Sequence, residues 1–155
     1  MQAARSGRER QVYTSDGVRK VCGVVPVLPD GQIVMVSSAK RVGDFILPKG
    51  GAETDETAPQ SAIREAFEEA GIRGTLRPNC LCSFRNEKVN KETGLPTSEF
   101  HFYIMDVTSL ESDWPEAALR TRATFTPSEA LDILLKHKSN SLYVAMQAYI
   151  TSQEQ

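Results

Sequence analysis

Residues 50–72 read GGAETDETAPQSAIREAFEEAGI, and this stretch decides the fold of the chain. Thr57 and Gln60 stand at the spacing of a capping box, in which each side chain satisfies a backbone N–H group at the start of a helix. Gly71 is typical of a helix end, because glycine readily adopts the left-handed conformation that closes the last turn. The spacing therefore predicts a helix over residues 58–70.

The predicted helix has two unlike faces. Glu65, Glu68 and Glu69 gather on one of them, because residues three and four apart are neighbours on a helix surface. Arg64 offsets part of their repulsion through its spacing to Glu68. Clustered carboxylates suit Mg²⁺, which prefers oxygen ligands, although such a face is more often simply exposed to solvent. We expect the nearly opposite, apolar face to be the buried one: Ala62, Ile63, Ala66, Phe67 and Ala70.

The residues around the helix decide between these two interpretations. Gly50 is followed after five residues by Glu56, and after seven more by residues 64–72, REAFEEAGI. This pattern resembles the Nudix box, G-x5-E-x7-R-E-U-x-E-E-x-G-U, in which U is aliphatic. Ala66 stands where the family usually has Ile, Leu or Val, and we expect this smaller side chain to weaken packing slightly. The resemblance implies hydrolysis of a nucleoside diphosphate linked to another group, or of a similar pyrophosphate.

The resemblance also implies a metal site. Glu65, Glu68 and Glu69 match the metal ligands of the family, and a backbone carbonyl near Gly50 matches an additional ligand. The implied cofactor is Mg²⁺, with Mn²⁺ as an alternative. Such a metal lowers the pKa of bound water, holds phosphate oxygens and stabilises charge in the transition state.

Catalytic and supporting roles follow from the same match. Glu69 matches a candidate general base, but the assignment between Glu68 and Glu69 stays open because coupled glutamates titrate together. Arg64 matches the arginine that orients a glutamate. Glu56 matches the residue that supports the entry to the helix, and Gly71 the residue that ends it.

Similarity to one Nudix subfamily extends over roughly residues 8–140. The matching segments are residues 10–13 (RQVY), 16–17 (DG), 35–38 (MVSS), 47–51 (LPKGG), 99–103 (EFHFY) and 137–138 (HK). They look like the diphosphoinositol-polyphosphate phosphohydrolases, and most like the fungal ones. Those enzymes remove the β-phosphate from inositol pyrophosphates, and they also cleave diadenosine polyphosphates and polyphosphate chains.

Basic and hydroxyl side chains outside the helix form the predicted substrate site. Several phosphates held at once require a ring of positive charges and hydrogen-bond donors. Arg41 and Arg120 align less clearly with the subfamily and are not placed in this set. The candidate substrate-binding residues are Arg10, Arg19, Lys20, Ser37, Ser38, Lys40, Lys49, Gly51, Arg122 and Lys138.

Strands and helices recur along the chain without strict strand–helix–strand alternation. We expect strands over residues 21–28, 32–38, 45–47, 75–85 and 99–108, helices over 127–136 and 142–150, and a long loop over 86–98. Pro26 predicts an edge or a bulge in the first strand, and residues 48–51 read as a loop with unusual backbone angles. The predicted fold is an α/β (α+β) Nudix fold, with a mixed sheet sandwiched between helices (α/β/α). We expect a single domain over residues 1–155, with residues 1–9 flexible.

Cysteine spacing and the lengths of apolar runs exclude several kinds of metal site and binding partner. The three cysteines form no C-x-x-C pair, which argues against a structural zinc site or a disulfide framework. No run approaches the roughly 18 apolar residues of a membrane span, and the N-terminus lacks the apolar region of a secretory signal. We expect a monomer in the cytosol or nucleus that binds a small polyphosphorylated molecule, and neither nucleic acid nor membrane.

Other readings of the same residues stay open. An ADP-ribose or nucleotide-sugar pyrophosphatase would favour an aromatic platform for a base, and the aromatic residues here are scattered. A ligand-sensing Nudix domain without activity usually loses box carboxylates, whereas Glu65, Glu68 and Glu69 are all present. RNA decapping would favour a basic patch interleaved with aromatic residues, which the sequence does not show.

Overall fold

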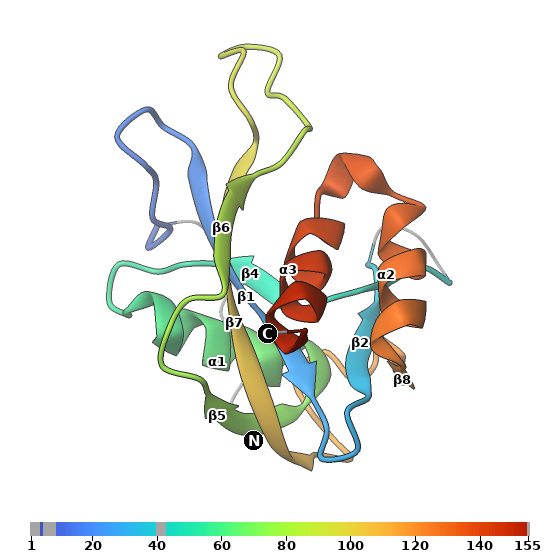
Figure 1. Ribbon diagram of the computed structural model, residues 1–155. Helices are drawn as coiled ribbons and strands as arrows, with labels where there is room; N and C mark the ends of the chain where they lie inside the picture. Colours follow the sequence, from blue (N-terminus) through green and yellow to red (C-terminus); the bar gives the residue numbers. More distant parts are fainter. Residues whose placement is uncertain (1–3, 5–8, 40–42, 155) are drawn as a thin grey trace.

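The computed structural model describes residues 4, 9–39 and 43–154 (Figure 1). Lys40 and most of the predicted flexible N-terminus therefore lie outside the described residues. The strands are β1 (Arg19–Val27), β2 (Ile33–Ser37), β3 (Phe45–Ile46), β4 (Lys49–Gly51), β5 (Ile72–Leu76), β6 (Cys82–Arg85), β7 (Ser98–Leu110) and β8 (Arg122–Phe125). The helices are α1 (Ala58–Ala70), α2 (Pro127–Leu135), the short 3-10 helix η1 (Lys138–Asn140) and α3 (Tyr143–Gln153).

The strands form one mixed sheet. Its main order is β3-β2-β1-β7-β5, with β4 paired to β1, β6 to β7 and β8 to β2. β1 and β7 run parallel, with Arg19 opposite Ser98 and Val27 opposite Asp106. The other pairings are antiparallel. The predicted mixed sheet is confirmed.

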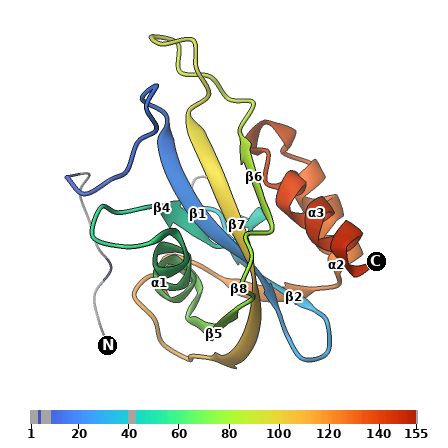
Figure 2. The ribbon, with the colours of Figure 1, turned by 60° about the vertical axis from the view of Figure 1, so that its left-hand side comes forward.

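Helices cover both faces of this sheet. α1 lies on one face, and α2 and α3 lie on the other (Figures 1 and 2). One buried cluster joins Leu134 of α2 and Met146 of α3 to Val25, and a second joins Ala62 of α1 to Val24. Side chains of neighbouring strand residues point to opposite faces of the sheet, so Val25 belongs to the first cluster and Val24 to the second. The predicted α/β/α sandwich is confirmed.

β1 is a central strand, which corrects the edge or bulge expected from Pro26. Its pairing with β4 ends at Gly23, and its pairing with β2 begins at Val27. Pro26 lies between these two partners. Its nitrogen faces the same edge of β1 as the N–H group of Val24, which donates to the carbonyl of Pro48 (3.1 Å). A proline, which has no N–H group to donate, fits where one partner strand gives way to the next.

Residues 49–51 are a strand, and not the loop with unusual backbone angles that the sequence suggested. β4 pairs with β1, and neither Gly50 nor Gly51 has a positive φ. Crowding by neighbouring side chains favours glycine at both positions instead. A Cβ at Gly50 would overlap the carboxylate of Glu65, and a Cβ at Gly51 would overlap the side-chain oxygen of Gln11.

α1 begins and ends as predicted. Thr57 and Gln60 form both hydrogen bonds of a capping box, and Gly71 adopts the left-handed conformation with φ 64°. The predicted buried face is confirmed for its three alanines, but Ile63 and the glutamates differ from expectation. Ile63 is 43% exposed, whereas Glu65, Glu68 and Glu69 are at most 9% exposed. The surface that packs on the sheet is the alanine stripe of Ala62, Ala66 and Ala70, each fully buried.

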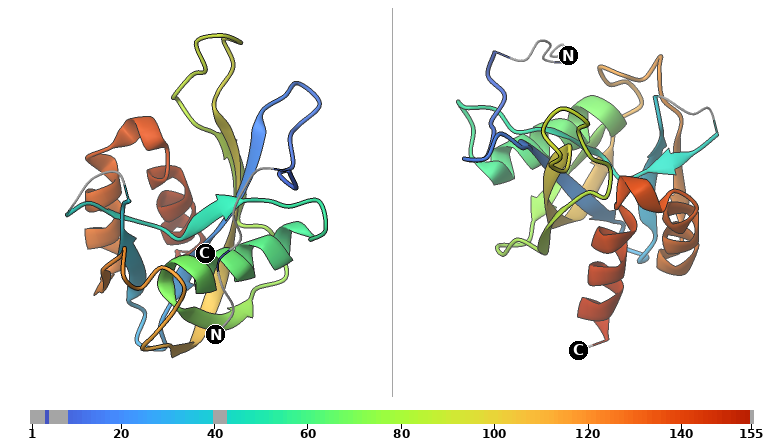
Figure 3. Two further views of the ribbon diagram at one scale, coloured as in Figure 1. Left: turned by 180° about the vertical axis from the view of Figure 1, so that it is seen from behind. Right: turned by 90° about the horizontal axis from the view of Figure 1, so that it is seen from above.

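Other boundaries also differ from expectation. The strand expected over residues 75–85 is two strands, because β5 pairs with the last part of β7 and β6 with the first part. β8 and η1 were not expected. The long loop predicted over residues 86–98 is a loop over residues 86–97, because Ser98 begins β7. This loop and the segment before β1 project from the same end of the sheet (Figures 2 and 3). Among the described residues, no helix has the length and apolarity needed to cross a membrane.

Candidate active site

Arg64 organises the acidic residues of α1. Its Nε donates to both carboxylate oxygens of Glu56 (3.0 and 2.9 Å), and its Nη1 donates to Glu65 (2.8 Å) and Glu68 (3.3 Å). Its Nη2 reaches the carbonyl of Gly51 (3.1 Å), which ties the helix to β4. Burial alone would lower the pKa of this guanidinium, but its hydrogen bonds to Glu56 and the neighbouring carboxylates raise it. Arg64 is therefore a permanent cation that holds two of the predicted ligands in place.

Glu65 and Glu69 are buried carboxyl groups with raised pKa values. Burial, and then repulsion from Glu69, raises the pKa of Glu65 from 4.5 to about 7. Burial also raises the pKa of Glu69, although Lys49 and Arg120 oppose this shift. The Glu69 carboxylate accepts the backbone N–H of Lys49 (3.1 Å) and lies 3.5 Å from Nη2 of Arg120. Each group would gain from a further positive charge nearby.

The donor set at α1 fits a hard divalent cation. Glu65, Glu68 and Glu69 offer only carboxylate oxygens, and they come from a buried helix face beside β4. Gly50 has no side chain, so its backbone passes directly beside the Glu65 carboxylate, where a Cβ would not fit. Oxygen ligands on a confined surface are what Mg²⁺ takes in proteins.

A second acidic group lies just before the helix. Carboxylate oxygens of Glu53, Asp55 and Glu56 lie within 4.8 Å of one another, a tighter grouping than the α1 glutamates form in the described part of the chain. Two members of this group already have arginine partners, since Arg64 binds Glu56 at 2.9 Å and Arg10 lies 3.4 Å from Asp55. We therefore assign this acidic group a structural role at the start of α1, which is the role that the sequence predicted for Glu56.

The end of α1 is anchored by an aromatic residue and an arginine. Nε1 of Trp114 donates to the carbonyl of Glu69 (2.8 Å), and Nη1 of Arg122 donates to the carbonyls of Ala70 and Glu111 (2.8 Å each). The guanidinium of Arg122 also lies 4.5 Å from the centre of the Trp114 ring. The structure thus places Arg122, a predicted substrate residue, at the helix end.

Trp114→Phe tests this anchor. The change keeps a large ring but leaves the buried carbonyl of Glu69 without its donor, so we expect the free energy of unfolding to fall by about 1–3 kcal/mol. Urea denaturation measures it. A free energy equal to that of the wild type would show that the hydrogen bond does not hold the helix end.

Arg120 lies in the site, although it was not among the substrate-binding residues predicted from the sequence. It is about one-tenth exposed, and it lies 3.5 Å from Glu69 while donating to Glu116 (2.8 Å) and to the carbonyl of Ser37 (2.9 Å). Nothing in the local sequence indicates that Arg120, and not Arg122, contacts the carboxylates of the site. The pairing of β8 with β2, which joins residues far apart in sequence, brings Arg120 to the site.

The other predicted substrate residues fall into two groups. Lys49 and Gly51 lie on β4 beside α1, and Ser37 ends β2, where its hydroxyl accepts the N–H of Thr121 (2.8 Å). The remaining residues lie farther along the surface: Arg10 pairs with Asp55, Arg19 donates to Gln11 (2.8 Å), Lys20 lies opposite Glu99 in the β1–β7 register, and Lys138 is exposed in η1.

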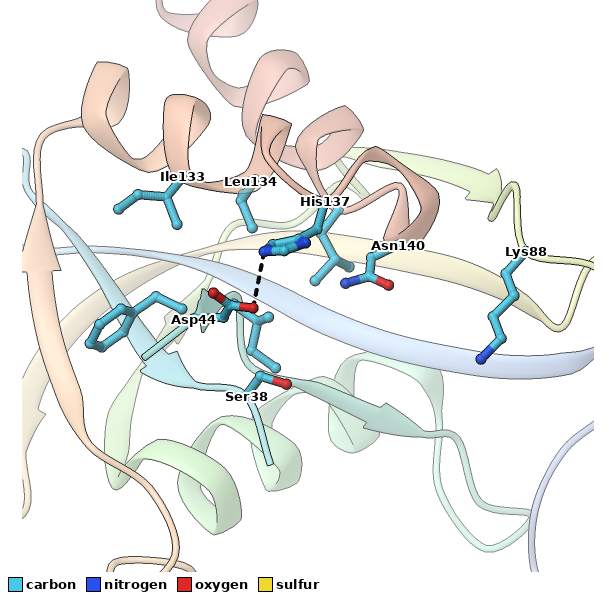
Figure 4. A pocket seen from close by; sticks show the side chains of 10 residues that line it. Ser38, Asp44, Lys88, Ile133, Leu134, His137 and Asn140 are labelled. Carbon is cyan, nitrogen blue, oxygen red and sulfur yellow. Dashed lines mark ion pairs between the residues drawn. The ribbon is translucent and has the colours of Figure 1, made fainter. Parts of the chain in front are cut away.

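A hollow lies beside this site, between β3, the end of α2 and η1 (Figure 4). Ser38 and Lys88 line it together with His137, whose Nε2 lies 2.9 Å from Oδ2 of Asp44. The sequence predicted Ser38 as a substrate residue but missed Lys88. A lysine inside a polar loop gives no local signal, and only the fold of loop 86–98 brings it to the hollow.

Gly50→Ala tests the crowded contact between β4 and α1. The new Cβ would displace the Glu65 carboxylate, so we expect kcat to fall by about a hundredfold, as small misplacements of catalytic groups do. Gly31→Ala is the control: Gly31 has φ 88° and open space around it, so the change strains a distant turn without touching the site. Steady-state kinetics should show kcat loss in the first variant only, and loss in both would implicate stability.

Comparisons with known proteins point to one family. A family model described as the NUDIX domain matches residues 18–145. Nudix hydrolase 12, mitochondrial, of Arabidopsis thaliana is 35% identical over 150 residues, which covers 84% of this chain and 73% of the relative. Diphosphoinositol polyphosphate phosphohydrolase 2 of Mus musculus is 28% identical over 134 residues, which covers 84% and 70%. A NUDIX hydrolase structure from Nitrosomonas europaea superposes with a TM-score of 0.66 at 19% identity, covering 87% of this chain and 90% of that one.

The comparisons identify the chain as a hydrolase that acts on phosphoanhydride bonds. The matched family model and the identity to the Arabidopsis relative show that the chain belongs to the Nudix family.

Proposed function

We propose that this chain hydrolyses phosphoanhydride bonds in phosphate-rich small molecules. Diphosphoinositol polyphosphates are the first proposed substrates, and diadenosine polyphosphates and inorganic polyphosphate are the next. The observation that carries the proposal is the buried carboxylate set of α1 with Lys49 and Arg120 beside it. A mammalian relative that bears the name of a diphosphoinositol polyphosphate phosphohydrolase supports the choice of substrate. We further propose a monomer of one domain, in the cytosol or nucleus.

The metal would be held by Glu65, Glu68 and Glu69, with the carbonyl of Gly50 as a further oxygen. When bound, Mg²⁺ (or Mn²⁺) supplies charge for phosphate oxygens and makes water more acidic. Arg64 keeps Glu65 and Glu68 in position through its hydrogen bonds of 2.8 and 3.3 Å. The cofactor is thus proposed to bind a site that the protein has already assembled.

The reaction adds the elements of water across one P–O–P bond. Water attacks one phosphorus atom, the bridging oxygen leaves with the other phosphate, and the proton passes to a carboxylate. Glu69 is proposed for this last role because its carboxylate can accept a proton from water. The backbone N–H of Lys49 (3.1 Å) and the guanidinium of Arg120 (3.5 Å) hold this carboxylate in place.

Substrate phosphates would meet cations on several sides of the site. Lys49 and Arg120 lie beside Glu69, and we add Arg120 and Lys88 to the predicted set. The farther members of the set would hold the more distant phosphates: Arg10, Arg19, Lys20 and Lys138. Ser37 and Ser38, at the end of β2, would donate hydroxyl hydrogen bonds to phosphate nearer the site. Charges at several points suit a substrate with several phosphates better than one with a single pyrophosphate.

A substrate panel with Mg²⁺ tests the proposal. It contains an inositol pyrophosphate, a diadenosine polyphosphate, short inorganic polyphosphate, ADP-ribose and capped RNA. We expect turnover of the first three at much higher kcat/KM than of ADP-ribose or capped RNA. Fast turnover of ADP-ribose without turnover of the first three would overturn the proposed substrate class.

Metal binding should depend on pH because the glutamates must lose their protons. The pKa of Glu65 rises from 4.5 to about 7 on folding, so its contribution to stability is present below about pH 4.5 and is lost as pH rises through about 7. Mg²⁺ binds the deprotonated site and reverses that loss. We therefore expect Mg²⁺ to raise Tm more at about pH 8 than at about pH 6. Thermal unfolding with and without Mg²⁺ measures this, and equal shifts at both pH values would contradict it.

A further inference from the structure

We propose that Ser83, His101 and Glu99 form a second catalytic site, at which Ser83 attacks small carboxylic esters as a nucleophile. The three side chains come from β6 and β7, which pair side by side with Ser83 opposite His101 (Figure 2). This site shares no residue with the carboxylate set of α1. Its activity is therefore separate from the proposed hydrolysis of phosphoanhydrides and needs no metal.

A chain of hydrogen bonds joins the three side chains. The hydroxyl of Ser83 lies 3.0 Å from Nδ1 of His101, and Nε2 of the same ring lies 3.0 Å from Oε1 of Glu99. At these distances a nucleophile, a general base and the group that orients the base act together. Serine, imidazole and carboxylate follow one another in this order in hydrolases of unrelated folds, although here the two ring nitrogens exchange places.

The carboxylate decides which nitrogen of the ring carries the proton. Ionised Glu99 can only accept, so Nε2 of His101 donates to it and Nδ1 keeps a lone pair for the Ser83 hydroxyl. Burial alone would raise the pKa of Glu99, but hydrogen bonds from Arg85 and His101 lower it below its ordinary value. Nε of Arg85 donates to Oε2 of Glu99 (3.0 Å), the oxygen that His101 does not use. The ring is thus held in the tautomer that accepts a proton from serine.

The nucleophile is open to solvent, whereas its partners are more enclosed. Ser83 is exposed, while the side chains of His101 and Glu99 are 23% and 21% exposed. Substrate can therefore reach the hydroxyl directly, and the base behind it is partly shielded from water. An open strand face offers little surface for binding, so a small, unhindered acyl group is the substrate that fits.

Ester hydrolysis at this site proceeds through an acyl group on Ser83. The serine oxygen attacks the carbonyl carbon, and its proton passes to Nδ1 of His101. The bond between the carbonyl carbon and the alcohol oxygen breaks, the alcohol leaves with that proton, and an acyl ester of Ser83 remains. Water then attacks this ester, with the same ring as base, and the carboxylic acid leaves.

Covalent labelling tests the nucleophile. The probe is an alkyl fluorophosphonate: the Ser83 oxygen attacks its phosphorus, fluoride leaves, and the proton passes to His101. We expect a label on Ser83, at a rate about a hundredfold lower in His101→Gln, which lacks the base. Fragment mass spectra distinguish this label from one on Cys80, whose sulfur lies 3.8 Å from the serine oxygen. Ser128→Ala, at an exposed serine of α2, is the control and should label normally. No label on Ser83, or equal rates with and without His101, would overturn the inference.

Glu99→Gln tests the positioning role of the carboxylate. Since Arg85 needs an oxygen to accept its hydrogen bond, the new amide would turn its NH2 group toward His101 and move the ring proton to Nδ1. That nitrogen could then no longer accept from Ser83. We expect labelling to slow at least about tenfold, and ¹⁵N spectra of the imidazole to show the change of tautomer. Unchanged labelling or an unchanged tautomer would remove Glu99 from the site.

Turnover separates the two activities of the chain. The wild type should hydrolyse p-nitrophenyl acetate in the presence of EDTA, and Ser83→Ala should lose this activity. The same variant should keep the wild-type Tm and the wild-type rate on phosphoanhydrides with Mg²⁺, which shows that its fold is intact. Equal hydrolysis of the ester by wild type and Ser83→Ala would overturn the inference.

Discussion

Glu69→Gln is expected to lower kcat for every substrate by about a thousandfold or more, because the change removes both a proposed metal ligand and the proposed general base. The amide has nearly the same size as the carboxyl group, and it cannot take up the proton of the attacking water. Steady-state and single-turnover kinetics with Mg²⁺ measure the loss.

Stability measurements separate this catalytic loss from damage to the fold. Since burial raises the pKa of Glu69, the folded protein without metal favours a neutral group at this position. The variant should therefore unfold no more readily than the wild type when Mg²⁺ is absent, and Mg²⁺ should raise its Tm less. Glu116→Gln is the matched control, since Glu116 also neighbours Arg120 but lies outside the helix. Full activity in Glu69→Gln would remove the assignment of this residue.

Local spacing was enough to predict where α1 begins and ends. Thr57, Gln60 and Gly71 act within one or two turns of the helix, so their effect can be read without knowledge of the rest of the fold. Local spacing did not show which face of the helix packs against the sheet. Ile63 and Phe67 are the most hydrophobic side chains of the helix, but the sheet accepts the flat alanine stripe, which leaves Ile63 exposed.

Strand pairing decides the features that the sequence did not reveal. Gly50 and Gly51 look like loop residues until β1 is seen to pair with them. Arg120 and Arg122 are two residues apart, yet one contacts Glu69 and the other caps α1. Arg120 lies just before β8 and Arg122 begins it, and their partners come from β2 and from the segment around Trp114. Contacts of this kind depend on residues far away in the chain.

Arg64→Met is expected to lower the free energy of unfolding of the metal-free protein by about 3–5 kcal/mol, as loss of one partner from a buried ion-pair network does. The Arg64 side chain is 13% exposed, and its three nearest carboxylates are no more than 12% exposed. Methionine matches the length of the side chain but supplies no charge, so these carboxylates would remain buried together. Urea denaturation without metal measures the change.

Arg77→Met is the matched control for this loss. Arg77 forms two hydrogen bonds with Asp106 (3.1 and 3.0 Å), but this pair is 39% and 55% exposed. Water screens exposed pairs, so we expect a cost of no more than about 1 kcal/mol. Mg²⁺ should restore part of the stability of Arg64→Met, because a cation among the α1 glutamates would replace some of the missing charge. Equal costs in the two variants would mean that Arg64 is an ordinary surface arginine, and that the glutamates of α1 are positioned by the helix alone.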